Sequence, residues 1–142
     1  MGTDCLYVFK YNNIYYIYMK GNDSHPSRFG KTIVNELQQM SAEDYIQLKN
    51  NLRAIDTHYT SYESYCGFTS LVHSTRNPHK YVFYISSTEP ELYIGISYIY
   101  IIDMDKNVFN VKWYGETRLN TDLYDLNNIP ESWDCLVDHS DE

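Results

Sequence analysis

The sequence predicts a two-layer α+β domain, in which a mainly antiparallel sheet is packed by a pair of helices on one face. Three observations lead to this fold class: a strand hairpin opens the chain, two amphipathic helices follow, and a strand meander occupies the second half. This order of elements is typical of α+β proteins. The chain has 142 residues, of which 43% are hydrophobic. That length suits one core, so residues 1–142 are expected to form a single domain.

The N-terminal hairpin is predicted from residues 5–11 and 14–19, which are rich in tyrosine, isoleucine, valine and phenylalanine. Asn12 and Asn13 separate the two runs, and asparagine tolerates the positive φ angles that a two-residue turn requires. A polar segment over residues 20–29, interrupted by glycine and proline, then leads to the first helix.

The two helices are predicted over residues 31–40 and 42–55, because each carries an apolar stripe at helical spacing. Ser41 and Asp44 resemble a capping box at the start of the second helix. The stripes consist of Ile33, Leu37 and Met40 in the first helix and of Tyr45, Leu48, Leu52 and Ile55 in the second. Both helices therefore have one side that faces the core.

The second half of the chain is predicted to contain the remaining strands. Residues 56–78 follow no periodic pattern and are expected to form a long loop with room for one short element. Strands are expected over residues 80–86, 93–103 and 108–114. The middle strand is apolar on both faces, as in a central strand that is covered on both sides. In the last one, Phe109, Val111 and Trp113 alternate with polar residues and are expected to point inward.

The net charge of −8 argues against two classes of partner. Most of the excess lies in residues 72–142, which carry −7. A field of this sign repels phosphate backbones and anionic lipids, so neither general nucleic-acid binding nor membrane binding is expected. The longest apolar stretch, residues 92–102, is also shorter than the roughly 20 residues that a membrane-spanning helix needs.

The cysteines indicate a reducing compartment. Cys5, Cys66 and Cys135 form no paired pattern, and the N-terminus does not resemble a signal peptide. A cytoplasmic location is therefore expected, which would be the host cytoplasm or the virion if the chain is viral. No cofactor is expected.

Residues 23–30 hold the most reactive side chains of the sequence. Ser24, Ser27 and Arg28 precede the first helix, whose free N–H groups and partial positive charge favour an anion. They are candidate ligand-binding residues for an anion or a nucleotide. In the structural alternative, the Asp and Ser residues cap the helix while Pro and Gly shape the turn.

A catalytic interpretation is also open. Cys5 would be the nucleophile of a small amide hydrolase, His25 would activate the thiol, and Asp23 and Arg28 would assist. Free cysteine is among the most buried residue types, however, and no nucleophile-elbow motif is present. The sequence leaves open whether the protein is an enzyme.

One segment approaches a calcium-binding pattern. Asp103, Asp105 and Asn107 stand at the first, third and fifth positions of such a loop. The sixth position is Val108 instead of glycine, and the twelfth is Tyr114 instead of glutamate. A hairpin turn rich in Asp and Asn explains these residues better.

A second segment approaches zinc-ligand spacing. Cys66, His73 and His79 lie within fourteen residues, and His58 could be a fourth ligand. The second cysteine of a Cys-x-x-Cys pair is missing. No metal site is predicted.

Tyrosine is the unusual feature of the composition, with 16 residues. A domain this small is not expected to bury all of them, and outward tyrosine side chains favour protein interfaces. The strand tyrosines are Tyr11, Tyr15, Tyr16, Tyr18, Tyr81, Tyr84, Tyr93, Tyr98 and Tyr100. The predicted function is therefore protein binding or a structural role, with another protein or a second copy as partner. A/T-rich codon usage is a rival explanation of the tyrosine content, and both can hold.

The chain begins with Met-Gly-Thr, and an Asp-Ser-x-Pro-x-x-x-Gly motif runs from Asp23 to Gly30 before the first helix. Together with the strand-and-turn run over residues 98–105, these features resemble a family of uncharacterised small proteins from phages, large DNA viruses, bacteria and fungi. The chain differs from that family at His25, where tyrosine is usual, and just after Met-Gly-Thr, where Arg-Gly is usual. The resemblance implies the same fold and a viral or mobile-element origin, and it implies no particular reaction.

Overall fold

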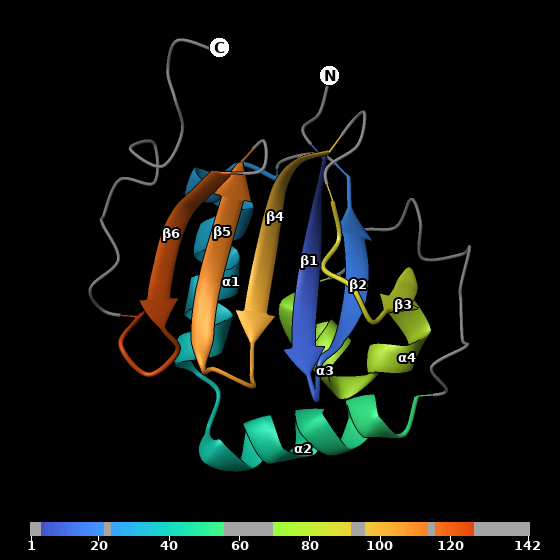
Figure 1. The fold of residues 1–142 in the computed structure, drawn as a ribbon. Helices are drawn as coiled ribbons and strands as arrows, with labels where there is room; N and C mark the ends of the chain where they lie inside the picture. Colours follow the sequence, from blue (N-terminus) through green and yellow to red (C-terminus); the bar gives the residue numbers. More distant parts are fainter. Residues whose placement is uncertain (1–3, 22–23, 56–69, 92–95, 114–115, 127–142) are drawn as a thin grey trace, which may run out of the picture.

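The computed structural model describes residues 4–21, 24–55, 70–91, 96–113 and 116–126 (Figure 1). In chain order, its elements are β1 (Asp4–Tyr11), β2 (Ile14–Lys20), the π-helical turn η1 (Pro26–Gly30), α1 (Lys31–Gln38), α2 (Ala42–Arg53), α3 (Leu71–Arg76), α4 (Pro78–Tyr81), β3 (Tyr84–Ser86), β4 (Ile96–Asp103), β5 (Val108–Trp113) and β6 (Glu116–Asp122). A sheet with helices packed on it is the α+β class that the sequence predicts.

The described strands form one sheet in the order β3-β2-β1-β4-β5-β6 (Figure 1). Neighbouring strands are antiparallel, except that β1 and β4 run parallel at the centre. This parallel pair joins the N-terminal hairpin to the C-terminal meander. Cys5 lies opposite Tyr98 at one end of the pair, and Lys10 lies opposite Asp103 at the other.

The hairpin turn is confirmed. Asn12 and Asn13 have φ angles of 54° and 60°, and Tyr11 pairs with Ile14 across the turn. Two consecutive positive φ angles give the turn whose twist matches that of the flanking strands. Asparagine is one of the few residue types that adopts this conformation at low cost.

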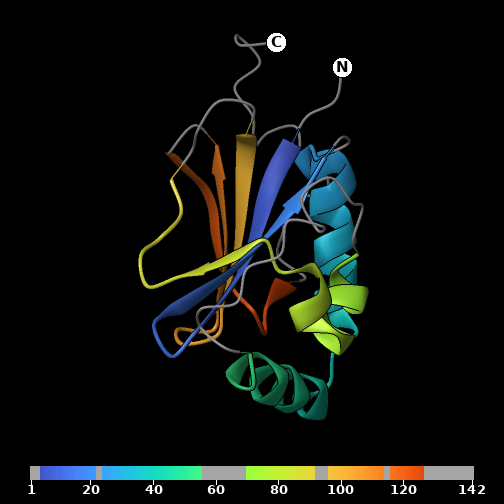
Figure 2. The same ribbon diagram turned by 90° about the vertical axis from the view of Figure 1, so that its right-hand side faces the viewer.

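Both predicted helices are confirmed, with slightly earlier ends. Ser41 caps α2, because its hydroxyl accepts from the Asp44 N–H while the Asp44 carboxylate accepts from the Ser41 N–H. Figure 2 shows α1 along one face of the sheet, and both views place α2 across the end of the sheet. The helices therefore shield one face and one end of the sheet.

The main core lies between the sheet and the helices, and it is unusually rich in tyrosine. Alternate strand residues point into it, together with Phe29 and Ile33 from the helical side. Its buried strand residues are Cys5, Tyr7, Phe9, Tyr16, Tyr18, Tyr98, Tyr100, Ile102, Phe109, Val111 and Trp113. The inward direction predicted for Phe109, Val111 and Trp113 is thus confirmed.

A second, smaller core lies on the opposite face of the sheet. It contains Leu6, Val8, Ile17, Met19, Ile96, Ile99 and Ile101. Phe83 and Tyr84 pack against it, and Figure 2 shows the chain that follows β3 on the side of the sheet away from α1. β4 is therefore buried on both faces, as its continuous apolar sequence predicts.

Two parts of the prediction differ from the structure. The strand predicted over residues 80–86 is confined to β3, because Pro78 opens the short helix α4 and proline is favoured at the first position of a helix. β6 was not predicted: its sequence, ETRLNTD, is polar and carries no clear alternation. The loop predicted over residues 56–78 lies partly outside the described residues, and its described part contains α3.

Candidate functional site

The loop before the first helix is fixed to the sheet by hydrogen bonds. Ser24 is buried, its hydroxyl donates to the Lys20 carbonyl at 3.4 Å, and its own carbonyl accepts from the Tyr100 hydroxyl at 2.6 Å. His25 Nδ1 lies 3.1 Å from the hydroxyl of Tyr98. Asp23 lies outside the described residues. These contacts give the Ser24 and His25 positions a structural role.

Cys5 is brought close to this loop, as the catalytic interpretation requires. The thiol hydrogen-bonds Ser24, and Cys5 pairs with Tyr98, which His25 contacts. Complete burial nevertheless raises the pKa of the Cys5 thiol to about 12, and the opposing effects of Ser24 and Lys20 are smaller. The thiol is therefore protonated at neutral pH. This favours the core role for Cys5 over the nucleophilic one.

Two backbone amides of η1, the turn just before the first helix, are used within the chain. The Arg28 N–H and the Gly30 N–H both donate to the His25 carbonyl, at 2.9 and 3.3 Å. Arg28 is exposed and Ser27 is half-buried. Two N–H groups just before the first helix thus contact a carbonyl, which favours the turn-forming role of residues 24–30.

The segment that approaches a calcium-binding pattern is a hairpin turn. Asp103 Oδ1 accepts from the N–H groups of Asp105 and Lys106, both at 3.0 Å, and Asn107 has a φ of 58°. Within the described ranges no three His, Cys, Asp or Glu residues are placed to hold a metal ion. Of the predicted zinc-spaced residues, His58 and Cys66 lie outside those ranges.

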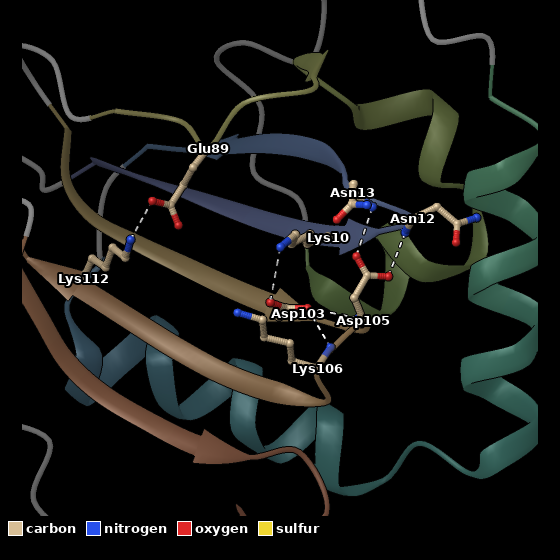
Figure 3. Close-up of polar contacts among 8 residues, drawn as sticks. All are labelled: Lys10, Asn12, Asn13, Glu89, Asp103, Asp105, Lys106 and Lys112. Atoms are coloured by element: carbon tan, nitrogen blue, oxygen red, sulfur yellow. Dashed lines mark hydrogen bonds and ion pairs between the residues drawn. The ribbon is translucent and has the colours of Figure 1, made fainter.

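The other carboxylate of this turn connects it to the N-terminal hairpin. Asp105 accepts from the Asn12 N–H at 2.8 Å and from the Asn13 N–H at 3.0 Å, one bond to each oxygen (Figure 3). The turns after β1 and β4 are therefore held together, at the end of the parallel pair.

Beside this junction lies a polar cleft of about 350 Å³. Its strand residues alternate with those of the main core, so the cleft opens on the sheet face opposite α1. Three lysines on β1, the β4–β5 turn and β5 contribute to it. The lining residues are Lys10, Tyr15, Glu89, Ile101, Asp103, Lys106, Val108, Asn110, Lys112, Thr117 and Asn120. We call this feature the lysine cleft.

Two of the three lysines form ion pairs. Lys10 Nζ lies 3.8 Å from Asp103 Oδ2, and both side chains are mostly buried. Burial by itself would lower the pKa of Lys10, but Asp103, Tyr15 and Asp105 together outweigh it and raise this pKa above its usual value. Lys112 Nζ lies 2.8 Å from Glu89 Oε2 (Figure 3). Lys10 is thus firmly cationic at neutral pH.

The remaining polar groups of the cleft are less satisfied. In the described part of the chain, the Lys106 ammonium has no hydrogen-bond or ion-pair partner. The side-chain oxygen of Asn110 is buried and accepts no hydrogen bond from any described residue. A buried acceptor of this kind favours a bound donor. The cleft can therefore offer both cations and an acceptor to a ligand.

Sequence reasoning did not find the lysine cleft. The alternation in β5 does predict that Asn110 and Lys112 point away from the main core. What it cannot predict is that Lys10 and Asp103 join them, because that depends on the parallel pairing of β1 with β4.

The structure divides the strand tyrosines between the two faces of the sheet. Tyr16, Tyr18, Tyr98 and Tyr100 are all buried in the main core. Tyr124, which follows β6, is 75% exposed. The tyrosine-rich strands therefore supply much of the main core, while Tyr15 and Tyr84 remain partly exposed on the opposite face of the sheet.

Comparison with family models, curated proteins and solved structures gave no significant match. Among the helices that the structure describes, none is both long and apolar enough to span a membrane.

Proposed function

We propose that this chain is a small acidic binding module that works through contacts with another protein or with a second copy of itself. The observation that carries this proposal is the lysine cleft on the face of the sheet opposite α1. Its polar groups stand on strands and on one tight turn, so they are held in place before a partner arrives. A viral or mobile-element origin is part of the proposal and is supported by the N-terminal resemblance.

The chemistry of the described residues favours binding over catalysis. The cysteine proposed as a nucleophile is buried and protonated, and His25 contacts the Tyr98 hydroxyl. The described lining of the lysine cleft contains neither cysteine, serine nor histidine. Ammonium, carboxylate and amide groups are instead the usual means of polar recognition at protein interfaces.

The edge of the sheet supports self-association as one form of this function. Among the described strands, β6 pairs with β5 alone. An edge strand of this kind can add a strand from another chain through main-chain hydrogen bonds. A second copy of the protein could therefore bind without using the lysine cleft.

The test combines light scattering with affinity capture. The full chain is run on size-exclusion chromatography over a range of concentrations, and tagged protein is incubated with lysate of the source cells. We expect either a defined oligomer or a partner that is retained by the unchanged protein and by Lys31→Gln but reduced by Lys112→Gln. Lys31 is exposed at the start of α1 and does not line the cleft, so it controls for loss of charge. A chain that stays monomeric and captures nothing would contradict the proposal.

A further inference from the structure

We propose that the lysine cleft binds an acidic, extended segment of a partner protein, and that Glu89 occupies part of this site in the free protein. The inference rests on the proposed binding function and specifies the chemistry of the partner. It predicts that this chain binds a glutamate-rich peptide, although the net charge of −8 on the chain opposes such binding.

The local charge of the cleft is opposite in sign to that of the chain. Its described lining contains three lysines and two carboxylates. Asp103 is not available for exchange, because it is 10% exposed and its carboxylate accepts two backbone N–H groups. Its ion pair with Lys10 therefore belongs to the floor of the cleft. The two lysines left for a ligand are Lys106 and Lys112.

Lys106 provides the first contact. It is exposed at the β4–β5 turn, and its backbone is fixed by the bond from its N–H to Asp103 Oδ1. Figure 3 shows its side chain next to Asp103, with the ion pair of Lys112 farther along the same face. A ligand carboxylate would find an ammonium there that makes no ion pair with any described residue.

Glu89 marks the second contact. Its carboxylate binds Lys112 at 2.8 Å although the side chain is 46% exposed, and it comes from the segment between β3 and β4 rather than from a strand. A ligand carboxylate that replaces Glu89 exchanges one ion pair for another and leaves no buried charge unpaired. Glu89 is therefore a competitor that the partner must displace.

Asn110 favours a peptide over a simple anion. In the register of β5, Asn110 is opposite Ile101 and Asn120, two residues before Lys112. Its buried oxygen needs a donor, which the backbone N–H of an extended peptide supplies and a carboxylate anion does not. Residues two apart on a strand lie about 7 Å apart, and the same spacing separates alternate residues of an extended peptide. An N–H and an acidic side chain of one segment can thus reach Asn110 and Lys112 together.

The binding test uses the full chain and a fluorescein-labelled acetyl-hexaglutamate amide, with hexaglutamine as the uncharged probe, in an anisotropy titration at low salt. We expect hexaglutamate to bind, hexaglutamine to bind much more weakly, and added salt to weaken the complex. Lys106→Gln should weaken hexaglutamate binding by roughly fivefold, the upper range for an exposed ion pair. Lys31→Gln makes the same charge change outside the cleft and should have little effect.

Substitution of Glu89 is expected to change the affinity for hexaglutamate in the direction opposite to that of Lys106→Gln. Glu89→Gln frees Lys112 and should tighten hexaglutamate binding by about threefold to fivefold. Glu91→Gln removes the same charge from the same segment, but Glu91 does not line the cleft, so it should change affinity little. Equal effects of the two substitutions would show a general charge effect and would overturn the role of Glu89.

Other outcomes separate this inference from the proposed function. If hexaglutamate does not bind, or if Lys106→Gln and Lys31→Gln weaken it equally, the inference is wrong. If Lys112→Gln abolishes capture of a partner while hexaglutamate does not bind, the proposed binding function is supported, and the inference that the ligand is acidic is wrong. A salt-sensitive dimer that depends on Lys106 would identify a second copy as the occupant and would also overturn the inference.

Discussion

The carboxylate of Asp105 accepts a hydrogen bond from the backbone N–H of Asn12, 93 residues earlier in the chain. Its second oxygen accepts from the next N–H, that of Asn13. One side chain thus satisfies two amides of a turn whose φ angles are both positive. Because the two turns follow the parallel strands β1 and β4, this contact fixes the end of the sheet at which the lysine cleft begins.

We expect Asp105→Ala to lower the free energy of unfolding by about 1 kcal/mol, comparable to the loss of a helix cap. Asp105→Asn keeps one acceptor oxygen and should fall between the alanine variant and the unchanged protein. Urea unfolding followed by circular dichroism measures both. If the alanine variant is as stable as the unchanged chain, the two turns are not energetically coupled by this side chain.

The buried tyrosines lead to a second prediction. Tyr100 donates to the Ser24 carbonyl at 2.6 Å inside the core, so Tyr100→Phe leaves a buried acceptor without this donor. Such a loss costs about 1–3 kcal/mol. Tyr124→Phe is the control, because Tyr124 is largely exposed and its change should be within a few tenths of a kcal/mol. Thermal and urea unfolding measure the stability of both variants. Equal stabilities would contradict the structural role of the Tyr100 hydroxyl.

The parts of the fold that sequence predicts well are local. Asn12 and Asn13 specify their turn through their tolerance of positive φ, and Ser41 with Asp44 specifies the start of α2. The alternation of β5 likewise predicts which residues face the core. Each of these patterns lies within a few residues and expresses one physical preference.

The parts that sequence does not predict depend on distant pairing. No local pattern places β4 beside β1, yet this pairing brings Lys10 next to Asp103. β6 is polar and lies at the edge of the sheet, so its sequence lacks the alternation of apolar and polar residues that would identify a strand. The strand tyrosines show the same limit, because composition does not predict which of them face the core: Tyr98 and Tyr100 lie in the main core, while Tyr15 and Tyr84 pack on the opposite face of the sheet.

A third prediction concerns the reactivity of Cys5. Because the thiol is buried and its pKa is raised to about 12, we expect its alkylation by iodoacetamide at pH 7.5 to be at least about tenfold slower than that of free cysteine. In urea the rate should approach that of free cysteine. Peptide mass spectrometry distinguishes Cys5 from Cys66 and Cys135. Rapid labelling of Cys5 in the folded chain would instead restore the hydrolase interpretation.

The last prediction follows from Glu36, whose carboxylate accepts the N–H of Val72 at 3.0 Å. Partial burial raises the pKa of Glu36 above its ordinary value of 4.5, and the hydrogen bonds from Val72 and Leu71 only partly offset this. Between the ordinary and the raised pKa the folded state binds more protons than the unfolded state. The Glu36 contribution therefore favours folding at low pH, and it is lost as the pH rises through this window.

Glu36→Gln removes this titration and keeps an oxygen that can accept from Val72. We therefore expect the stability of Glu36→Gln relative to the unchanged chain to increase as the pH rises from 4 to 7. Glu43→Gln on the exposed start of α2 controls for the general loss of a negative charge, since Glu43 is near a helix N-terminus and its removal should not stabilise the fold at neutral pH. Urea unfolding at pH 4 and pH 7 gives the difference in the free energy of unfolding between each variant and the unchanged chain. A difference that stays constant with pH would mean that burial of Glu36 has no effect on its protonation.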